Sequence, residues 1–398
     1  MFLDRLVSLN PGLPKAAARL HQSGAVRSNT YVIDLDALGA NARIIKEAAD
    51  ANGLSLYFMS KQFGRNPDAC RALRDAGVSA AVAVDVQDME AVRRSGVPVG
   101  HVGHLVQPHL GSEDAVVAAE PEVVTVFSVD AAERVAAAAS RAGRVQDVLL
   151  RVTAPGDRFY FGHGGGFPLS GIEGAAAAVS RVRGLRVAGV TTFPCLLADP
   201  SARTVEVTSN FGTLREAADR LRSAGFDVRQ VNAPGTTSAR TMGALRAGGA
   251  THAEPGNGFH GTAPQHAFDP DSPEVPAIVY VSEVSHLDGG DAYVFAAGYY
   301  VDKVLGDYRL TALCGRDERI VERRYPVDTA PEGAIHYYCV LRLGPNHDVR
   351  PGDTVVFCFR PQTFVTRART QAVAGVRGGA PVPLGVYDQE ARPVEGAS

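Results

Sequence analysis

The sequence lacks the features that mark secreted, membrane-spanning and nucleic-acid-binding proteins. Its five cysteines are widely spaced and form no CxxC pair, which argues against a disulfide framework or a structural zinc site. The net charge is −3, so there is no basic excess to attract nucleic acid or an anionic membrane. No apolar run reaches ~18 residues, and the first residues lack the basic and apolar regions of a secretory signal. We therefore expect a cytoplasmic protein with no nucleic-acid or membrane partner.

What is present is the composition of an ordinary globular protein. Of the 398 residues, 45% are hydrophobic and 21% are charged. This length allows one large domain and a smaller one.

From residue 54 onward, short apolar strands alternate with Ala- and Arg-rich helices. The expected strands are 54–60, 79–84, 98–105, 122–128, 146–153, 185–193, 228–233 and 250–254. The expected helices are 66–76, 86–95, 112–119, 130–142, 171–183, 203–224 and 238–247. Such alternation predicts a parallel sheet, and eight strands in succession predict a closed (β/α)8 barrel of the TIM type. An open doubly wound sheet is the alternative, although it rarely needs eight strands in a row.

The rest of the chain divides around this barrel. We expect an N-terminal helical lead-in at 1–27, the barrel at 28–265 and a Pro- and Asp-rich linker at 266–276. From 277 to 398 short strands and turns follow one another without a convincing helix, which predicts a smaller all-β domain. Near the start of the barrel region, the strand TYVIDL at 30–35 leads into a helix for which Asp36 is the expected N-cap.

Polar residues stand where the expected barrel strands end, which is where barrel enzymes build their active sites. Lys61 ends the first strand, although a lone lysine there is more often solvated surface. Asn232-Ala-Pro-Gly-Thr-Thr-Ser238 follows the seventh strand and Glu254-Pro-Gly-Asn-Gly258 the eighth. The loops after these two strands commonly bind phosphate. A simple turn with an N-cap explains the first loop but not the matched glycine-rich loop beside it.

The order of these segments resembles the alanine racemase-like, fold-type III enzymes that depend on pyridoxal 5′-phosphate (PLP). TYVIDLDALGANARIIKE, the strand ending at Lys61 and GVTTF at 189–193 carry the resemblance over residues 28–258. KQFGRNP, GHLVQ, EPGNGFHGT, SEVSH and AGYY make the whole chain most similar to a YhfX-like branch. D-threonine aldolases and D-serine dehydratases of this fold bind a metal through a histidine and a Cys or Asp on a late strand. The corresponding stretch here, 360–365, has neither, so no metal is expected.

The resemblance implies PLP as the cofactor and Lys61 as the residue that forms the internal aldimine. The other implied cofactor contacts are Arg151, Phe193, Asn232, Gly235, Thr236, Glu254, Gly256 and Asn257. Arg151 would approach the phenolic oxygen or a substrate carboxylate, or else be a solvated arginine. Phe193 stands where relatives often carry a ring-stacking histidine, or else belongs to the barrel core.

Glu254 departs from the alanine racemases, which have an arginine at this point. The EPG segment is similar to the EPGR of ornithine and diaminopimelate decarboxylases, whose glutamate holds the pyridine nitrogen as a pyridinium. The arginine of that motif is replaced by Asn257. A carboxylate partner makes the ring a strong electron sink, which favours bond breaking at Cα without selecting racemisation.

In these enzymes the second domain closes the active site, usually that of a partner subunit, and supplies a base opposite the lysine. Tyr299 and Tyr300 are the candidates here, and Cys314 is a weaker one. Adjacent strand residues face opposite ways, so at least one of the two tyrosines is an ordinary sheet residue. We expect a homodimer with a shared active site.

Three histidines are further candidates for acid–base chemistry. His163 lies in the glycine-rich loop Phe161–Phe167, which could close over a substrate or be a flexible surface loop. His101 and His104 more often satisfy hydrogen bonds inside a barrel than do chemistry.

The combined prediction is a PLP-dependent enzyme that acts at Cα of an amino acid or amine, most simply a racemase or epimerase with Lys61 and one tyrosine as its two bases. A PLP-dependent decarboxylase is the alternative that Glu254 suggests. A non-catalytic PLP-binding homeostasis protein is another, but such a carrier does not need a second domain to shape a substrate pocket.

Overall fold

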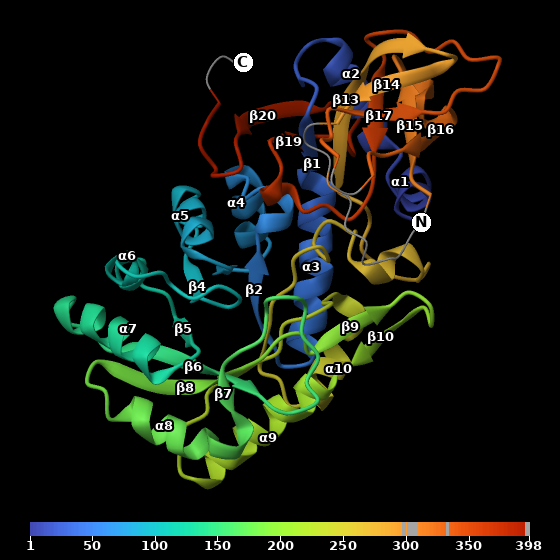
Figure 1. Cartoon of the computed structure of the whole chain (residues 1–398). Coiled ribbons are helices and arrows are strands. Elements are labelled where there is room, and N and C mark those ends of the chain that lie inside the picture. Colours follow the sequence, from blue (N-terminus) through green and yellow to red (C-terminus); the bar gives the residue numbers. More distant parts are fainter. Residues whose placement is uncertain (297–299, 301–308, 332–333, 395–398) are drawn as a thin grey trace. The chain divides into compact units, whose positions relative to one another are not determined.

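The structure is a computed structural model that describes residues 1–296, 300, 309–331 and 334–394. The chain forms two compact units (Figure 1). One, here called the β-domain unit, comprises Met1–Ala42, Lys61–Ala76 and Asn257–Ser398. The other, the barrel unit, comprises Arg43–Ser60 and Gly77–Gly256.

The barrel unit contains a closed ring of eight parallel strands. In ring order they are β2 (Ser55–Met59), β3 (Ala80–Ala83), β4 (Val99–Val102), β5 (Val123–Val126), β6 (Gln146–Thr153), β8 (Leu185–Thr191), β11 (Gln230–Asn232) and β12 (His252–Ala253). The ring closes because β12 pairs with β2 as well as with β11. A short strand, β7 (Phe167–Pro168), pairs with the end of β6. The expected (β/α)8 barrel is confirmed.

Helices connect the strands, as the alternating pattern predicts. They are α3 (Leu35–Ala51), α4 (Pro67–Asp75), α5 (Val86–Arg94), α6 (Glu113–Ala118), α7 (Val129–Arg141), α8 (Ile172–Ser180), α9 (Ser209–Ser223) and α10 (Met242–Ala247). Helices α7, α8 and α9 lie outside strands β6 and β8 (Figure 1). The side chains of Asp85 and Ser128 cap α5 and α7, so these two residues near strand ends have structural roles.

Two local expectations were wrong. Residues 203–207 are not helical, because β9 (Leu196–Asp199) and β10 (Thr204–Val207) form an antiparallel hairpin and α9 begins only at Ser209. Three of the four residues of β10 are β-branched, which suits a strand better than a helix. The helix after β1 (Thr30–Asp34) is capped by Asp34, not Asp36, since Asp34 Oδ1 accepts from the amides of residues 36 and 37 at 3.0 and 3.1 Å.

The β-domain unit is built on one mixed sheet whose strands come from both ends of the chain. Its order is β14-β17-β16-β15-β18-β13-β1-β19-β20. The C-terminal members are β13 (Ile278–Asp288), β14 (Asp291–Phe295), β15 (Thr311–Gly315), β16 (Arg324–Asp328), β17 (Tyr338–Leu341), β18 (Thr354–Phe357), β19 (Arg369–Ala374) and β20 (Val382–Tyr387). Strand β1 lies between β13 and β19. Helices α1 (Phe2–Leu9) and α2 (Gly12–Gln22) bury their apolar sides in the same core as this sheet.

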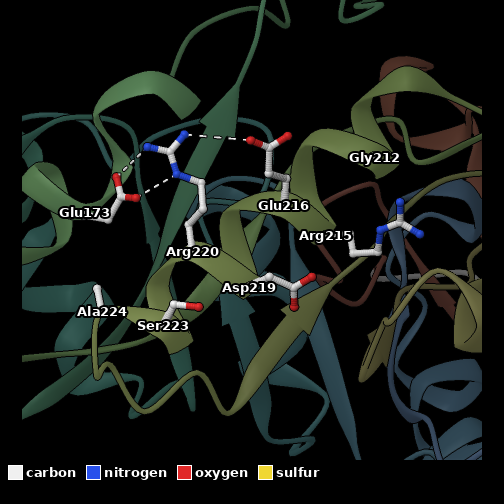
Figure 2. A pocket seen from close by; sticks show the side chains of 8 residues that line it. All are labelled: Glu173, Gly212, Arg215, Glu216, Asp219, Arg220, Ser223 and Ala224. Atoms are coloured by element: carbon white, nitrogen blue, oxygen red, sulfur yellow. Dashed lines mark hydrogen bonds and ion pairs between the residues drawn. The ribbon is translucent and has the colours of Figure 1, made fainter.

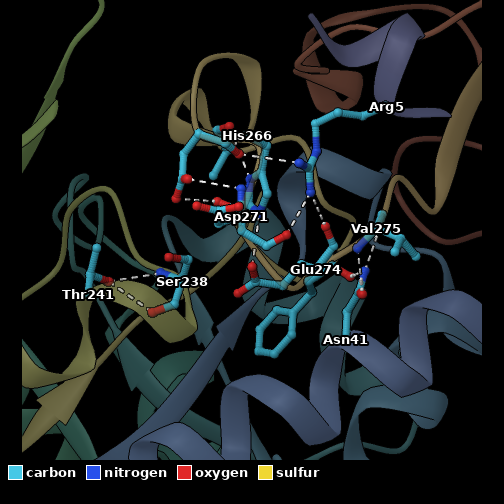
Figure 3. Close-up of polar contacts among 12 residues, drawn as sticks. Arg5, Asn41, Ser238, Thr241, His266, Asp271, Glu274 and Val275 are labelled. Carbon is cyan, nitrogen blue, oxygen red and sulfur yellow. Dashed lines mark hydrogen bonds and ion pairs between the residues drawn. The ribbon is translucent and has the colours of Figure 1, made fainter. Parts of the chain in front are cut away.

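Residues 266–276, whose composition predicted a linker, are tied to the N-terminal helices of this unit (Figure 3). The guanidinium of Arg5 donates to four carbonyl oxygens of residues 269–274. Asn41 bonds both backbone groups of Val275, and His266 Nε2 lies 3.0 Å from Glu274 Oε2. The segment is therefore fixed by buried polar contacts within the β-domain unit. No helix in the described part of the chain has the length and apolar character to cross a membrane.

Candidate active site

The barrel unit gathers polar side chains from its strand ends around one buried carboxylate, that of Glu254, which directly follows β12. Glu254 Oε1 lies 2.5 Å from His101 Nδ1 and 2.6 Å from Asn232 Nδ2. His101 belongs to β4 and Asn232 ends β11. Glu254 Oε2 lies 3.3 Å from Nδ1 of His104 but receives no hydrogen bond from a described residue.

This carboxylate is held in its ionised form. Its side chain is completely inaccessible to solvent, as are those of the two histidines. Burial raises the pKa of Glu254, but the nearby His104 and His101 and the hydrogen bonds to the carboxylate outweigh it, so that the pKa falls to about 2. An ionised, buried oxygen without a donor fits a ligand that brings a proton, such as a protonated ring nitrogen.

The same three side chains, His101, His104 and Glu254, have the composition of a metal site. Two ligands of a tetrahedral zinc ion, each about 2.0 Å from it, lie roughly 3.3 Å apart. The 2.5 Å between His101 Nδ1 and Glu254 Oε1 is the distance of a hydrogen bond instead. The cluster is therefore arranged as a hydrogen-bond network.

Arg151, in β6, is a buried cation. It is 1% exposed, and its guanidinium donates to the carbonyl oxygens of His104 at 3.3 Å and His163 at 2.6 Å. Burial lowers its pKa to about 10, and its ring contacts are Phe127 at 4.8 Å and Phe159 at 5.9 Å. Among the described residues no carboxylate pairs with it and Nε has no acceptor. Arg151 is thus not a solvated arginine, and its environment suits an anionic oxygen of a ligand.

Phe193 follows β8, and its ring packs against three other rings, one of which, that of His163, belongs to the glycine-rich loop. Its ring centroid lies 5.5 Å from that of His104, 5.6 Å from Tyr160 and 5.9 Å from His163. Phe193 is only partly buried, so it is not a plain core residue. Gly166 lets the loop approach β6 closely, because a Cβ there would lie 2.5 Å from the Arg151 carbonyl oxygen, and its φ is +129°.

The loop after β11 meets the β9 segment. A Cβ on Gly235 would lie 2.6 Å from backbone atoms of Leu196, and the Thr236 amide donates to the Leu196 oxygen at 3.0 Å. The need for glycine at 235 is thus explained by packing. The amides of Gly235 and Thr237 have no acceptor among the described residues, although Thr237 is buried. Two backbone donors of this loop are free for an anion.

Around this end of the barrel, several buried polar atoms have no hydrogen-bond partner among the described residues. They are Ser60 Oγ after β2, Arg151 Nε, Thr192 Oγ1 after β8, Asn232 Oδ1 and Glu254 Oε2. Buried polar groups without a hydrogen bond are rare in folded proteins. The strand ends of the barrel unit are therefore shaped for a polar ligand, and this donor set fits PLP, with a carboxylate for the ring nitrogen and a cation for an oxygen.

Lys61 belongs to the β-domain unit, although it comes two residues after β2 in the chain. It begins a one-turn 3-10 helix, and its Nζ lies 5.3 Å from the ring centroid of Phe364. The turn is braced by Thr363, whose Oγ1 donates to the carbonyl oxygen of Gln62 at 2.6 Å. The backbone next to Lys61 is thus held in place, and a nucleophilic lysine requires such a fixed position.

The remaining candidates lie apart from this cluster or in the other unit. Gly256 is a partly exposed residue of the loop after β12. With its side-chain amide oriented so that the oxygen faces Arg360, Asn257 accepts from Arg360 Nε at 3.0 Å. Tyr300 is 46% exposed, and Tyr299 lies outside the described residues. Cys314 is buried in β15, and burial raises the pKa of its thiol well above the ordinary value, which makes it a poor base.

A second pocket of the barrel unit is lined by ion pairs and not by the polar residues of the strand ends. It lies between α8 and α9, where Arg220 pairs with Glu173 and Glu216 (Figure 2). These ion pairs are largely exposed and sit on the outer helices, away from the strand ends, so the pocket has no counterpart in the expected chemistry.

Sequence reasoning missed Thr125 altogether and did not connect His101 with Glu254. Thr125 Oγ1 lies 2.5 Å from His101 Nε2, and both residues are fully buried. The signal was a polar residue inside each of two otherwise apolar strands, β4 and β5.

Two family models match the chain. The alanine racemase N-terminal domain matches residues 33–264, and the YhfX-like C-terminal domain matches residues 279–382. The "Uncharacterized protein YhfX" of Escherichia coli is 39% identical over 388 residues, which is 98% of each chain.

Three solved structures share the fold. D-threo-3-hydroxyaspartate dehydratase from Delftia sp. HT23 has a TM-score of 0.69 at 18% identity, over 90% of this chain and 97% of its own. D-threonine aldolase from Filomicrobium marinum has a TM-score of 0.66 at 17% identity, over 92% of this chain and 96% of its own. Alanine racemase from Clostridium difficile 630 has a TM-score of 0.65 at 14% identity, over 92% of this chain and 99% of its own.

The expected cofactor is the cofactor of this family, and the expected resemblance extends through both parts of the chain. The chain belongs to the PLP-dependent, alanine racemase-like family and, with its YhfX-like C-terminal domain, to the YhfX-like branch of that family.

Proposed function

We propose that this protein is a PLP-dependent enzyme that breaks a bond at Cα of an amino acid, and that the reaction is racemisation or epimerisation. The observation that carries the proposal is the buried, ionised carboxylate of Glu254, whose Oε2 receives no hydrogen bond from the part of the chain that the structure describes. PLP, when bound, supplies an electron sink for the electron pair left at Cα. A carboxylate against the ring nitrogen keeps a proton there and strengthens this sink.

The other residues of this chain then have separate tasks. Lys61 binds the cofactor covalently through Nζ and moves the Cα proton on one face. Tyr299 or Tyr300 moves it on the other face. Gly235, Thr236, Gly256 and Asn257 hold the phosphate, for which the free amides of the 232–238 loop are donors. Arg151 supplies positive charge for the phenolic oxygen or the substrate carboxylate, and Phe193 packs on the ring.

The second candidate function is PLP-dependent decarboxylation, which the carboxylate at position 254 also favours. Both reactions leave an electron pair at Cα and differ in the bond that breaks. The fold of the similar structures does not separate these two reactions. A non-catalytic PLP carrier is disfavoured by the β-domain unit, which such a carrier does not need.

One experiment separates these possibilities. The purified PLP-bound protein is incubated in deuterium oxide with L- and D-amino acids in turn, and proton NMR follows each Cα hydrogen. We expect exchange of that hydrogen for deuterium together with conversion of one enantiomer into the other. Loss of CO₂ without the enantiomer would establish the decarboxylase instead, and no exchange with any amino acid would refute both enzymatic proposals.

We also propose that the protein acts as a homodimer whose active sites each take Lys61 from one chain and the tyrosine base from the other. Light scattering is expected to give twice the 41.9 kDa mass of the chain. Mixing Lys61→Ala protein with a Tyr299→Phe/Tyr300→Phe double variant, after dissociation and reassociation, should restore about one quarter of wild-type activity, since half the molecules then carry one intact site. A fully active monomer, or no restoration from two folded variants, would contradict the shared site.

A further inference from the structure

The buried network around Glu254 is directional. A carboxylate can only accept hydrogen bonds, so His101 must donate from Nδ1 to Oε1 across the 2.5 Å contact. Asn232 donates to the same oxygen from Nδ2 at 2.6 Å. The 3.1 Å between Asn232 Nδ2 and His101 Nδ1 follows from this shared acceptor. Two donors therefore converge on Oε1, while Oε2 receives none from a described residue.

Thr125 fixes the other side of the imidazole. Its Oγ1 lies 2.5 Å from His101 Nε2, and both side chains are fully buried. With Nδ1 directed at Glu254 Oε1, Nε2 faces the Thr125 hydroxyl, so both ring nitrogens of His101 have a hydrogen-bond partner. Thr125 therefore holds the imidazole in the orientation in which Nδ1 donates to Glu254 Oε1.

Such an arrangement decides where a shared proton resides. A buried carboxylate and a ring nitrogen can share one proton in two ways. The proton stays on the nitrogen if the surroundings stabilise the carboxylate anion, and it moves to the carboxylate if they do not. Burial alone favours a protonated, neutral Glu254. The donors on Oε1, together with His104, whose Nδ1 lies 3.3 Å from Oε2, stabilise the carboxylate anion, so that a cofactor nitrogen placed against Oε2 would keep its proton.

We propose that His101, supported by Thr125, is a positioning residue that keeps Glu254 ionised and turned with Oε2 toward the cofactor nitrogen, so that the nitrogen holds its proton. This inference rests on the proposed pairing of Glu254 with that nitrogen. His101 itself touches neither substrate nor cofactor. It acts through Glu254, from a strand that is 153 residues away in the sequence.

The test measures directly whether the ring nitrogen of the cofactor is protonated. The protein is reconstituted with PLP labelled with ¹⁵N in the ring, and solid-state ¹⁵N NMR distinguishes a protonated from an unprotonated nitrogen. We expect a protonated signal in wild-type protein and an unprotonated one in Glu254→Gln. His101→Phe, which keeps the ring but removes both nitrogens, should convert most of the signal to the unprotonated position, and Thr125→Val should convert a smaller part.

Two further variants distinguish positioning from general damage to the core. His101→Asn places an amide donor close to the position of Nδ1 and should restore the protonated signal. Glu122→Gln alters another acid of the barrel unit, which accepts from the Tyr57 hydroxyl at 2.7 Å, and should leave the signal unchanged. If His101→Phe does not fold, as judged by circular dichroism, the near-isosteric Thr125→Val carries the test through its partial loss of the protonated signal.

The outcomes separate this inference from the proposed function. An unchanged protonated signal in Glu254→Gln would refute the pairing of Glu254 with the nitrogen. A loss of protonation in Glu254→Gln with no change in either His101→Phe or Thr125→Val would refute the role of His101 and leave the pairing of Glu254 with the nitrogen standing. One equivalent of a divalent metal in the wild-type protein, lost in His101→Phe, would show that the cluster is a metal site and would also overturn the inference.

Discussion

Lys61→Ala is expected to abolish both the covalent attachment of PLP and catalysis. The visible absorption band of lysine-bound PLP should disappear, because no other amine is proposed to take its place. Turnover should fall by at least about 10²-fold, since the same side chain is proposed to move the Cα proton. Ultraviolet–visible spectra of the variant after incubation with PLP, and the NMR exchange assay, measure the two effects.

Lys46→Ala is the matched control for this prediction. Lys46 lies in α3 and pairs with Asp50 one turn further along the helix. Its removal should leave the spectrum and the rate unchanged, because an i,i+4 pair on a helix surface contributes only about 0.3–0.5 kcal/mol to stability. If Lys61→Ala kept the band and the rate while remaining folded, its proposed role would be wrong.

Glu254→Gln is expected to slow the reaction while PLP stays bound. The substitution keeps the shape of the side chain and removes the charge that holds a proton on the ring nitrogen. Loss of one charge-assisted contact in a dry site costs on the order of 2–4 kcal/mol of barrier, or roughly 30- to 1000-fold in rate. The affinity for PLP should change much less, because Lys61 and the phosphate loops are untouched.

Single-turnover rates and PLP titrations of Glu254→Gln measure these two quantities separately. Glu122→Gln is a useful comparison, because Glu122 is an acid of the barrel unit that bonds the Tyr57 hydroxyl at 2.7 Å and does not touch Glu254. A wild-type rate in Glu254→Gln would refute the electron-sink proposal. An equal loss of rate in Glu122→Gln would show that the effect comes from the core and not from the ring nitrogen.

The barrel could be predicted from the sequence because its signal is local. Apolar runs such as the one that becomes β2 alternate with helices around the ring, and three of these helices, α4, α5 and α7, begin at a residue whose side chain caps them. The hairpin of β9 and β10 was missed because its short strands interrupt the alternation and precede a real helix, α9, so that they read as its first turns.

Contacts between distant segments could not be predicted in the same way. The sequence shows that 30–34 is a strand but not that β1 pairs with β13 and β19, which lie more than two hundred residues away. Glu254 could be identified from its EPG motif. Its hydrogen bond to His101 could not be predicted, because the two residues are 153 positions apart in the sequence. The glycine at 235 suggested a ligand, and the structure shows that the Leu196 backbone already requires it.

The most direct test of the account is to find which lysine carries PLP. The chain has only four lysines, at positions 15, 46, 61 and 303, so borohydride reduction followed by proteolysis and mass spectrometry gives an unambiguous result. We predict one phosphopyridoxyl group per chain, on the peptide that contains Lys61. Labelling of another lysine, or no labelling of a protein saturated with PLP, would contradict the proposed active site.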